Sequence, residues 1–111
     1  MTARIIDGKA LAEKVRAAAK PAVERLTARG VQPGLAVIIA GDDPASHTYV
    51  RNKIKACADT GVRSELHQLP ASTTQSALLE RVRALNADPR VHGILVQMPL
   101  PKHIDSTSVL E

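Results

Sequence analysis

The sequence predicts an α/β domain, in which helices flank a small, mostly parallel β-sheet in a three-layer arrangement. Segments with apolar residues at helical spacing alternate along the chain with short apolar runs that are typical of strands. Two of these runs are apolar at their centres without alternation, which is typical of strands buried on both faces of a parallel sheet. The 111 residues, 44% hydrophobic and 23% charged, suffice for one ordinary globular domain.

The first predicted helix has a stripe of apolar residues at helical spacing, and Gly30 is a natural stop for it. Pro21 lies within this pattern. Because proline lacks a backbone donor and clashes with the preceding turn, it predicts a kink or a break near Lys20. The stripe consists of Leu11, Val15, Ala18, Ala22 and Leu26.

The first strand is expected over residues 35–40, and a loop follows it from Gly41 to Pro44. Pro44 can occupy the first helical turn, which makes Asp43 the expected cap of the next helix. This helix is predicted to begin near Ala45 or Ser46 and to end at Gly61. Its apolar stripe consists of Val50, Ile54 and Cys57.

An edge strand is expected over residues 62–69, because apolar and polar side chains alternate there. Val62 and Leu66 would occupy one face, and His67 would lie on the opposite, solvated face. Ser72 and Gln75, three residues apart, have the spacing of a capping box for a further helix. The apolar positions of that helix are Leu78, Val82 and Leu85, and residues 86–89 end it.

The last strand is expected over residues 91–97, and two prolines in the segment that follows exclude both helix and central strand. Residues 105–107 resemble the start of a helix. The chain stops at Glu111, so such a helix would have little to pack against, and we expect residues 1–111 to be a domain truncated at its C-terminal end.

Composition narrows the class of function. A single cysteine and the lack of an apolar signal or spanning segment favour a cytoplasmic protein without membrane contact. The net charge of +4 is scattered along the chain with hardly any aromatic residues, which speaks against nucleic-acid binding. The histidines show no metal-ligand spacing, and no glycine-rich nucleotide motif is present, so neither a metal nor a dinucleotide site is expected in this chain.

In open α/β sheets, ligands bind beyond the carboxyl ends of the strands. Residues 41–46 and residues 97–101 would meet at that edge. Tyr49 and Lys53 lie four residues apart on the helix that begins there, so their side chains share one face at the border of the core. Such a lysine can act as a general acid or base, and the tyrosine can stack on an aromatic ligand. The alternative is an ordinary packed tyrosine beside a solvated lysine.

Gln97 interrupts an apolar run at the end of a buried strand, where a polar side chain needs a hydrogen-bond partner. Two interpretations remain open on the sequence alone. The amide either bonds the loop backbone, or faces the pocket and bonds a ligand or Lys53. Cys57 lies on the buried stripe and is expected to serve packing rather than catalysis.

These residues belong to two longer stretches that resemble the signatures of the bacterial methylenetetrahydrofolate dehydrogenase/cyclohydrolases. The first is GDDPASHTYVRNK (residues 41–53), and the second is VHGILVQMPLP (residues 91–101). The likeness covers essentially the whole chain. It implies the N-terminal folate-binding domain of a bifunctional enzyme of one-carbon metabolism and purine biosynthesis, cytoplasmic and homodimeric when intact. That enzyme oxidises 5,10-methylenetetrahydrofolate with NADP and hydrolyses the methenyl product to 10-formyltetrahydrofolate.

The resemblance also implies roles for individual residues. Tyr49 would stack on the aminobenzoyl ring of the folate, and Lys53 would be the catalytic lysine beside the one-carbon bridge. Gln97 would hydrogen-bond that lysine, and Pro99 and Leu100 would line the folate pocket. The Asp-x-Asp-Gly motif that orients the pterin and the Rossmann domain that binds NADP lie beyond Glu111 in the family's pattern. The alternative is a folate-binding module without catalysis.

Overall fold

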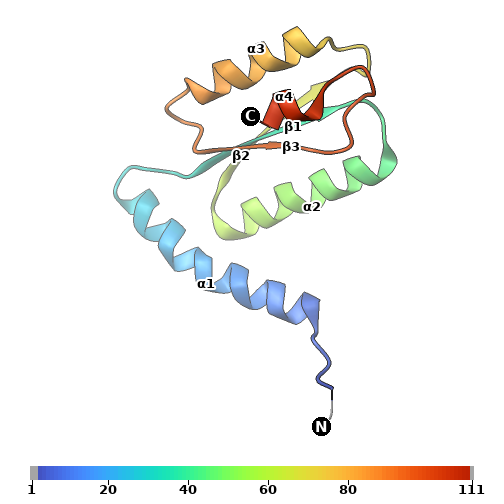
Figure 1. The fold of residues 1–111 in the computed structure, drawn as a ribbon. Helices are drawn as coiled ribbons and strands as arrows, with labels where there is room; N and C mark the ends of the chain where they lie inside the picture. The colour runs from blue at the N-terminus through green and yellow to red at the C-terminus, as the bar shows by residue number, and fades with distance from the viewer. Residues whose placement is uncertain (1–2, 111) are drawn as a thin grey trace.

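The computed structural model describes residues 3–110 and confirms the predicted α/β class. Four helices and three strands follow one another along this part of the chain (Figure 1). The helices are α1 (Gly8–Ala28), α2 (Pro44–Thr60), α3 (Gln75–Asn86) and α4 (Ser106–Leu110). The strands are β1 (Gly34–Ala40), β2 (Arg63–Leu69) and β3 (Gly93–Val96).

The sheet is parallel and has the order β2-β1-β3, so β1 is its central strand. Figure 1 shows α3 and α4 on one side of this sheet and α2 on the other, which gives three layers. Because all three strands run the same way, the loops after β1 and β3 leave the sheet at the same edge. The fold therefore brings together the two segments in which the candidate residues lie.

Alternate residues of β1 supply the two halves of the core. Ala36 and Ile38 pack with Leu78 and Leu85 of α3, while Val37 and Ile39 pack on the other face with Val50 of α2. These strand side chains are at most 2% exposed. The continuous apolar run predicted a strand buried on both faces, and the structure confirms it.

Helix α1 stands outside the three layers and packs against α2 (Figure 1). It has no buried residue, and Val15 from its apolar stripe is 60% exposed. Of the kink or break expected near Lys20, the break is absent, because the helix continues through Pro21. Both Pro21 and Ala17, whose carbonyl loses its helical donor, are exposed, so water can satisfy that carbonyl.

The edge strand β2 corrects another expectation. His67 was predicted on a solvated face, yet its side chain is only 13% exposed, while Leu66 is 46% exposed. The register explains the difference, because His67 pairs with Ile38 and so shares the face that α3 covers. There the Arg81 guanidinium of α3 lies 3.3 Å from Nδ1 of His67.

The two C-terminal helices also differ from expectation in detail. Helix α3 begins with Thr74 as its cap, whose hydroxyl accepts a hydrogen bond from the backbone N–H of Ala77, so the predicted capping box starting at Ser72 is wrong. Helix α4 has more to pack against than expected. Val109 is 6% exposed and joins the core cluster beneath α3, together with Ile104 from the preceding turn.

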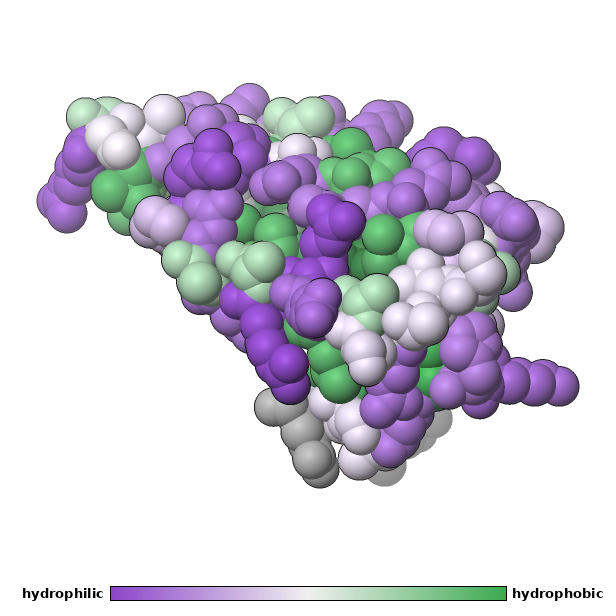
Figure 2. Space-filling model, turned by 90° about the horizontal axis from the view of Figure 1, so that it is seen from above, coloured by the Kyte–Doolittle hydropathy of each residue, from purple (hydrophilic) through white to green (hydrophobic). Residues whose placement is uncertain are grey.

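Figure 2 looks at the molecule from above, the side on which α3 lies in Figure 1, and shows apolar side chains as separate patches among hydrophilic ones. Within residues 3–110, no helix is long and apolar enough to cross a membrane.

Candidate functional site

The loop between β1 and α2 is shaped by two local features. Gly41 has a φ of +96°, a left-handed conformation that side chains with a Cβ rarely adopt. Asp43 caps α2, because its Oδ1 accepts a hydrogen bond of 3.0 Å from the backbone N–H of Ser46. The sequence predicted this cap, and Pro44 occupies the first helical position as expected. The start of α2 is thereby fixed at the carboxyl edge of the sheet.

Gln97 leaves the sheet at the same edge, directly after β3. Its backbone N–H still bonds the carbonyl of Ile38 in β1 at 2.9 Å, so its position is set by the central strand. Its side chain is 8% exposed overall and reaches towards α2. The Nζ atom of Lys53 donates a hydrogen bond of 2.7 Å to Oε1 of Gln97. Residues 44 positions apart in the sequence thus form one amine–amide pair.

The other half of the Gln97 amide is also used. Its Nε2 donates to the backbone carbonyl of Met98 at 3.1 Å. One end of the amide therefore bonds the loop backbone and the other bonds Lys53, so these two hydrogen bonds, offered as alternatives by the sequence, occur together. The contact with Met98 also fixes which way the amide points, because a backbone carbonyl only accepts hydrogen bonds. Oxygen must face Lys53, and nitrogen must face Met98.

Tyr49 lies one helical turn before Lys53 on α2 and is 58% exposed. A ring face is consequently free for stacking against a flat ligand. Pro99 is exposed and Leu100 is half-buried, both just beyond Gln97. Leu100 packs partly against the core cluster under α3, so it also has a structural task.

Cys57 lies on the buried face of α2, and burial raises the pKa of its thiol. A protonated, buried thiol is a poor nucleophile, in keeping with the predicted packing role. Within residues 3–110, no cluster of three or more histidine, cysteine or acidic side chains has the arrangement to hold a metal ion. The chemistry available at this edge is therefore that of an amine, an amide and a phenol ring.

The start of α2, the helix that follows the central strand, does not fit a dinucleotide such as NADP. In the sheet folds that bind dinucleotides, the pyrophosphate occupies a helix N-terminus that follows a strand. Here the corresponding N-terminus, that of α2, is already capped by the Asp43 carboxylate. A second anionic group at that place would be repelled by this carboxylate.

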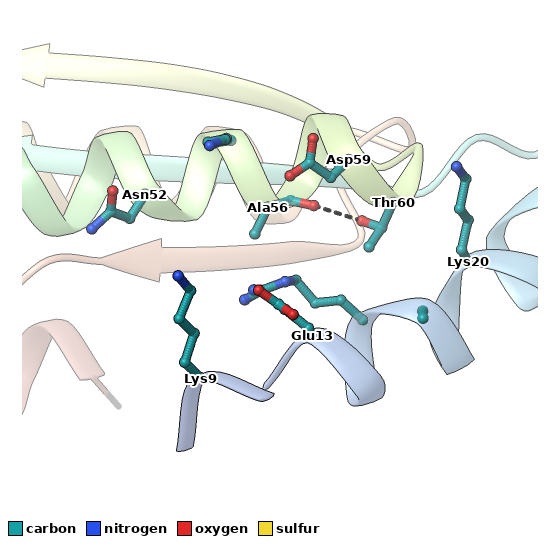
Figure 3. A pocket seen from close by; sticks show the side chains of 10 residues that line it. Lys9, Glu13, Lys20, Asn52, Ala56, Asp59 and Thr60 are labelled. Carbon is teal, nitrogen blue, oxygen red and sulfur yellow. Dashed lines mark hydrogen bonds between the residues drawn. The ribbon is translucent and has the colours of Figure 1, made fainter. Parts of the chain in front are cut away.

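A cavity of about 630 Å³ forms a separate groove between α1 and α2 (Figure 3). Figure 3 shows Lys9 of α1 pointing towards α2 across this groove. Its charged lining mixes both signs and includes neither Lys53 nor Gln97. These charged residues are Lys9, Glu13, Arg16, Lys20, Lys55 and Asp59.

One contact at the edge was missed from the sequence. Ser46, which is 3% exposed, donates from Oγ to the Met98 carbonyl at 3.1 Å. A serine in the first turn of a helix is commonplace, and nothing in the local pattern distinguishes it from a second capping residue. The partner, Met98, lies 52 positions further along the chain, so the contact becomes visible only in the folded structure.

Fold and site together define a class of protein. This is an α/β domain that presents a hydrogen-bonded lysine–glutamine pair and an accessible aromatic ring where parallel strands end, the place where such folds bind small molecules.

Comparison with known proteins narrows this class. The family model for the catalytic domain of tetrahydrofolate dehydrogenase/cyclohydrolase matches residues 6–111. The chain belongs to the tetrahydrofolate dehydrogenase/cyclohydrolase family. The resemblance seen in the sequence is thereby confirmed.

Individual relatives agree. The bifunctional protein FolD of Ralstonia nicotianae is 63% identical over all 111 residues, which amount to 38% of its own length. The crystal structure of FolD from Campylobacter jejuni has a TM-score of 0.92 and 47% identity, covering 95% of this chain and 37% of that one. FolD of Trypanosoma brucei, solved with NADP cofactor and an inhibitor, has a TM-score of 0.92 and 43% identity, covering 99% and 38%. The chain spans less than two fifths of these relatives.

Proposed function

We propose that this chain is the folate-binding part of a methylenetetrahydrofolate dehydrogenase/cyclohydrolase. The observation that carries the proposal is the 2.7 Å hydrogen bond between Lys53 and Gln97 at the carboxyl edge of the sheet. Membership of the family supports it, as do the relatives named as bifunctional dehydrogenase/cyclohydrolases. Residues 1–111 would correspond to the N-terminal substrate domain of the whole enzyme.

In this proposal the folate lies across the strand ends, with its aminobenzoyl ring on the exposed face of Tyr49. Lys53 then reaches the one-carbon bridge from one turn further along α2. Pro99 and Leu100 would border the ligand on the side of the loop after β3. The mildly basic chain, with a net charge of +4, suits a substrate that carries glutamate carboxylates.

The hydrolytic step can be derived from the residues present. Water adds to the methenyl carbon, and Lys53 in its neutral form takes up the proton that the water loses. The bond between that carbon and N5 of the folate then breaks as Lys53 returns the proton to N5, which leaves the 10-formyl product. Gln97 holds the amine in position through Oε1 and, being uncharged, does not fix it permanently as an ammonium ion. A carboxylate at this place would hinder the reaction, because it would stabilise the already protonated amine, which cannot accept a proton from water.

The oxidation step requires NADP, which accepts hydride in this family, and the start of α2 does not fit it. We infer that NADP is bound by sequence outside this chain. The 111 residues alone should therefore show no dehydrogenase activity, and only weak hydrolysis or none. A homodimer of the whole enzyme and a cytoplasmic location are further parts of the proposal.

The test is the full-length protein that carries this sequence, with Lys53→Met. Methenyltetrahydrofolate hydrolysis should fall by roughly 100-fold or more, the range expected when a general acid–base group is removed. Lys55→Met is the matched control, because Lys55 is an exposed lysine on the same helix and should leave the rate unchanged. Undiminished hydrolysis by the Lys53 variant would refute the assigned role. Saturable folate binding without turnover by the unaltered protein would favour the non-catalytic module instead.

A further inference from the structure

Ser46 lies in the first turn of α2 and has a buried hydroxyl, whose hydrogen bond differs from those of the other hydroxyl side chains in this helix. Helical serine and threonine hydroxyls commonly bond the carbonyl one turn earlier. Thr48 does this with Pro44 at 3.0 Å, and Thr60 does it with Ala56 at 2.9 Å. Ser46 instead reaches across to the loop after β3 and donates to the Met98 carbonyl at 3.1 Å.

The Met98 carbonyl joins Ser46 to the candidate site. It accepts two hydrogen bonds, one from Oγ of Ser46 and one from Nε2 of Gln97, which fill both of its lone-pair directions. The same Gln97 amide receives Lys53 on its oxygen at 2.7 Å. Three hydrogen bonds therefore run in series from Ser46 through Met98 and Gln97 to Lys53.

Both ends of this series lie on one helix. Ser46 and Lys53 are seven residues apart, which is close to two helical turns, so they share a face of α2 about 10 Å apart along the axis. The backbone of Ser46 is itself held by the Asp43 cap at 3.0 Å. Residues 97 and 98 are thus clamped against α2 at two points, and only one of those points is the lysine.

We propose that Ser46 is a positioning residue for the Lys53–Gln97 pair: by holding the Met98 carbonyl, it fixes the orientation of the Gln97 amide that faces the lysine. The proposal rests on the function proposed above and adds a residue to it. Without the hydroxyl, the carbonyl loses one of its two donors at a place where Ser46 is only 3% exposed, so water cannot readily replace it. The Met98 carbonyl is then free to shift, and the amide follows it.

The test uses Ser46→Ala in the full-length protein, with Ser46→Cys as a variant of similar volume and weaker donor strength. Thr48→Ala is the matched control, because it removes an exposed hydroxyl from the same turn without touching Met98. We expect kcat for methenyl hydrolysis to fall roughly tenfold in Ser46→Ala, since small misplacements of catalytic groups cost rate. The KM should stay within about twofold, because the folate contacts remain. The cysteine variant should lie between the alanine variant and the unaltered protein.

Two further readouts separate positioning from a loss of folding. The pH dependence of kcat should change in Ser46→Ala and not in Thr48→Ala, while the midpoint of urea unfolding establishes that each variant is folded. An unchanged kcat and pH profile in a folded Ser46→Ala protein would overturn the proposal, as would an equal loss in Thr48→Ala. Lys53→Met in the same series tells the two proposals apart. If it abolishes hydrolysis while Ser46→Ala does not affect it, only the positioning role fails.

Discussion

Replacing Gln97 by glutamate turns the side-chain amide into a carboxylate and leaves the shape of the side chain almost unchanged. The new carboxylate would lie 2.7 Å from Nζ of Lys53, on a side chain that is 8% exposed. An opposite charge this close typically moves a protonation equilibrium by about 1–3 pH units towards the charged form. The carboxylate would therefore form an ion pair with Lys53, and this pairing would oppose the role of the amine as acceptor of the proton from water.

The expected result is a fall in kcat for methenyl hydrolysis of about tenfold or more, because the ion pair opposes the action of Lys53 as a base. The assay is kcat for hydrolysis by the full-length protein across the pH range. Gln68→Glu, an exposed amide-to-acid change on β2, is the matched control and should leave the profile in place. A Gln97→Glu profile that coincides with that of the unaltered protein would refute the reasoning.

Three predictions concern the stability of this chain, each measured by urea unfolding. Leu78→Ala should lower the free energy of unfolding by about 2–5 kcal/mol, because Leu78 is 0% exposed in the core beneath α3; a loss below about 1 kcal/mol would contradict this packing. Asp43→Ala should cost about 1 kcal/mol through loss of the α2 cap, and no loss would mean that the cap is idle. Burial raises the pKa of the Cys57 thiol, so its contribution to stability is complete below about pH 8.5 and declines as the pH rises through the folded value. Cys57→Ala should flatten that alkaline decline, and an equally steep decline in the variant would refute the assignment.

The sheet could be predicted from the sequence because its strands carry strong local signals. Residues 35–40 are apolar without alternation, and only burial on both faces explains such a run. Once the strands are parallel, their carboxyl ends must share an edge, so the segments that hold Lys53 and Gln97 were expected close together, while the bond between the two side chains was left open. Gln97 itself was conspicuous because a polar side chain that ends a buried strand needs a partner.

Three of the misses have a common physical origin, because each depended on what lies next to an element rather than on the element's own residues. His67 alternates correctly along β2, but which face α3 covers is a tertiary property that alternation does not reveal. Pro21 is tolerated because α1 lies at the surface, where a carbonyl without a helical donor can bond water. The contact of Ser46 with Met98 joins distant segments through one hydroxyl, and no pattern of residues in the sequence predicts it.

The central claim is that a folate stacks on Tyr49. It can be tested directly because the chain contains one tyrosine and no phenylalanine or tryptophan, so the ring signals of Tyr49 are easily identified. Its ring protons can be followed by NMR while a reduced folate is titrated into the chain, with Tyr49→Leu as the control. The account predicts saturable, concerted movement of the ring signals as the folate stacks on them, and weaker binding by the leucine variant. Saturable binding that leaves the ring signals in place, or no binding at about 1 mM, an affinity of only about −4 kcal/mol, would contradict it.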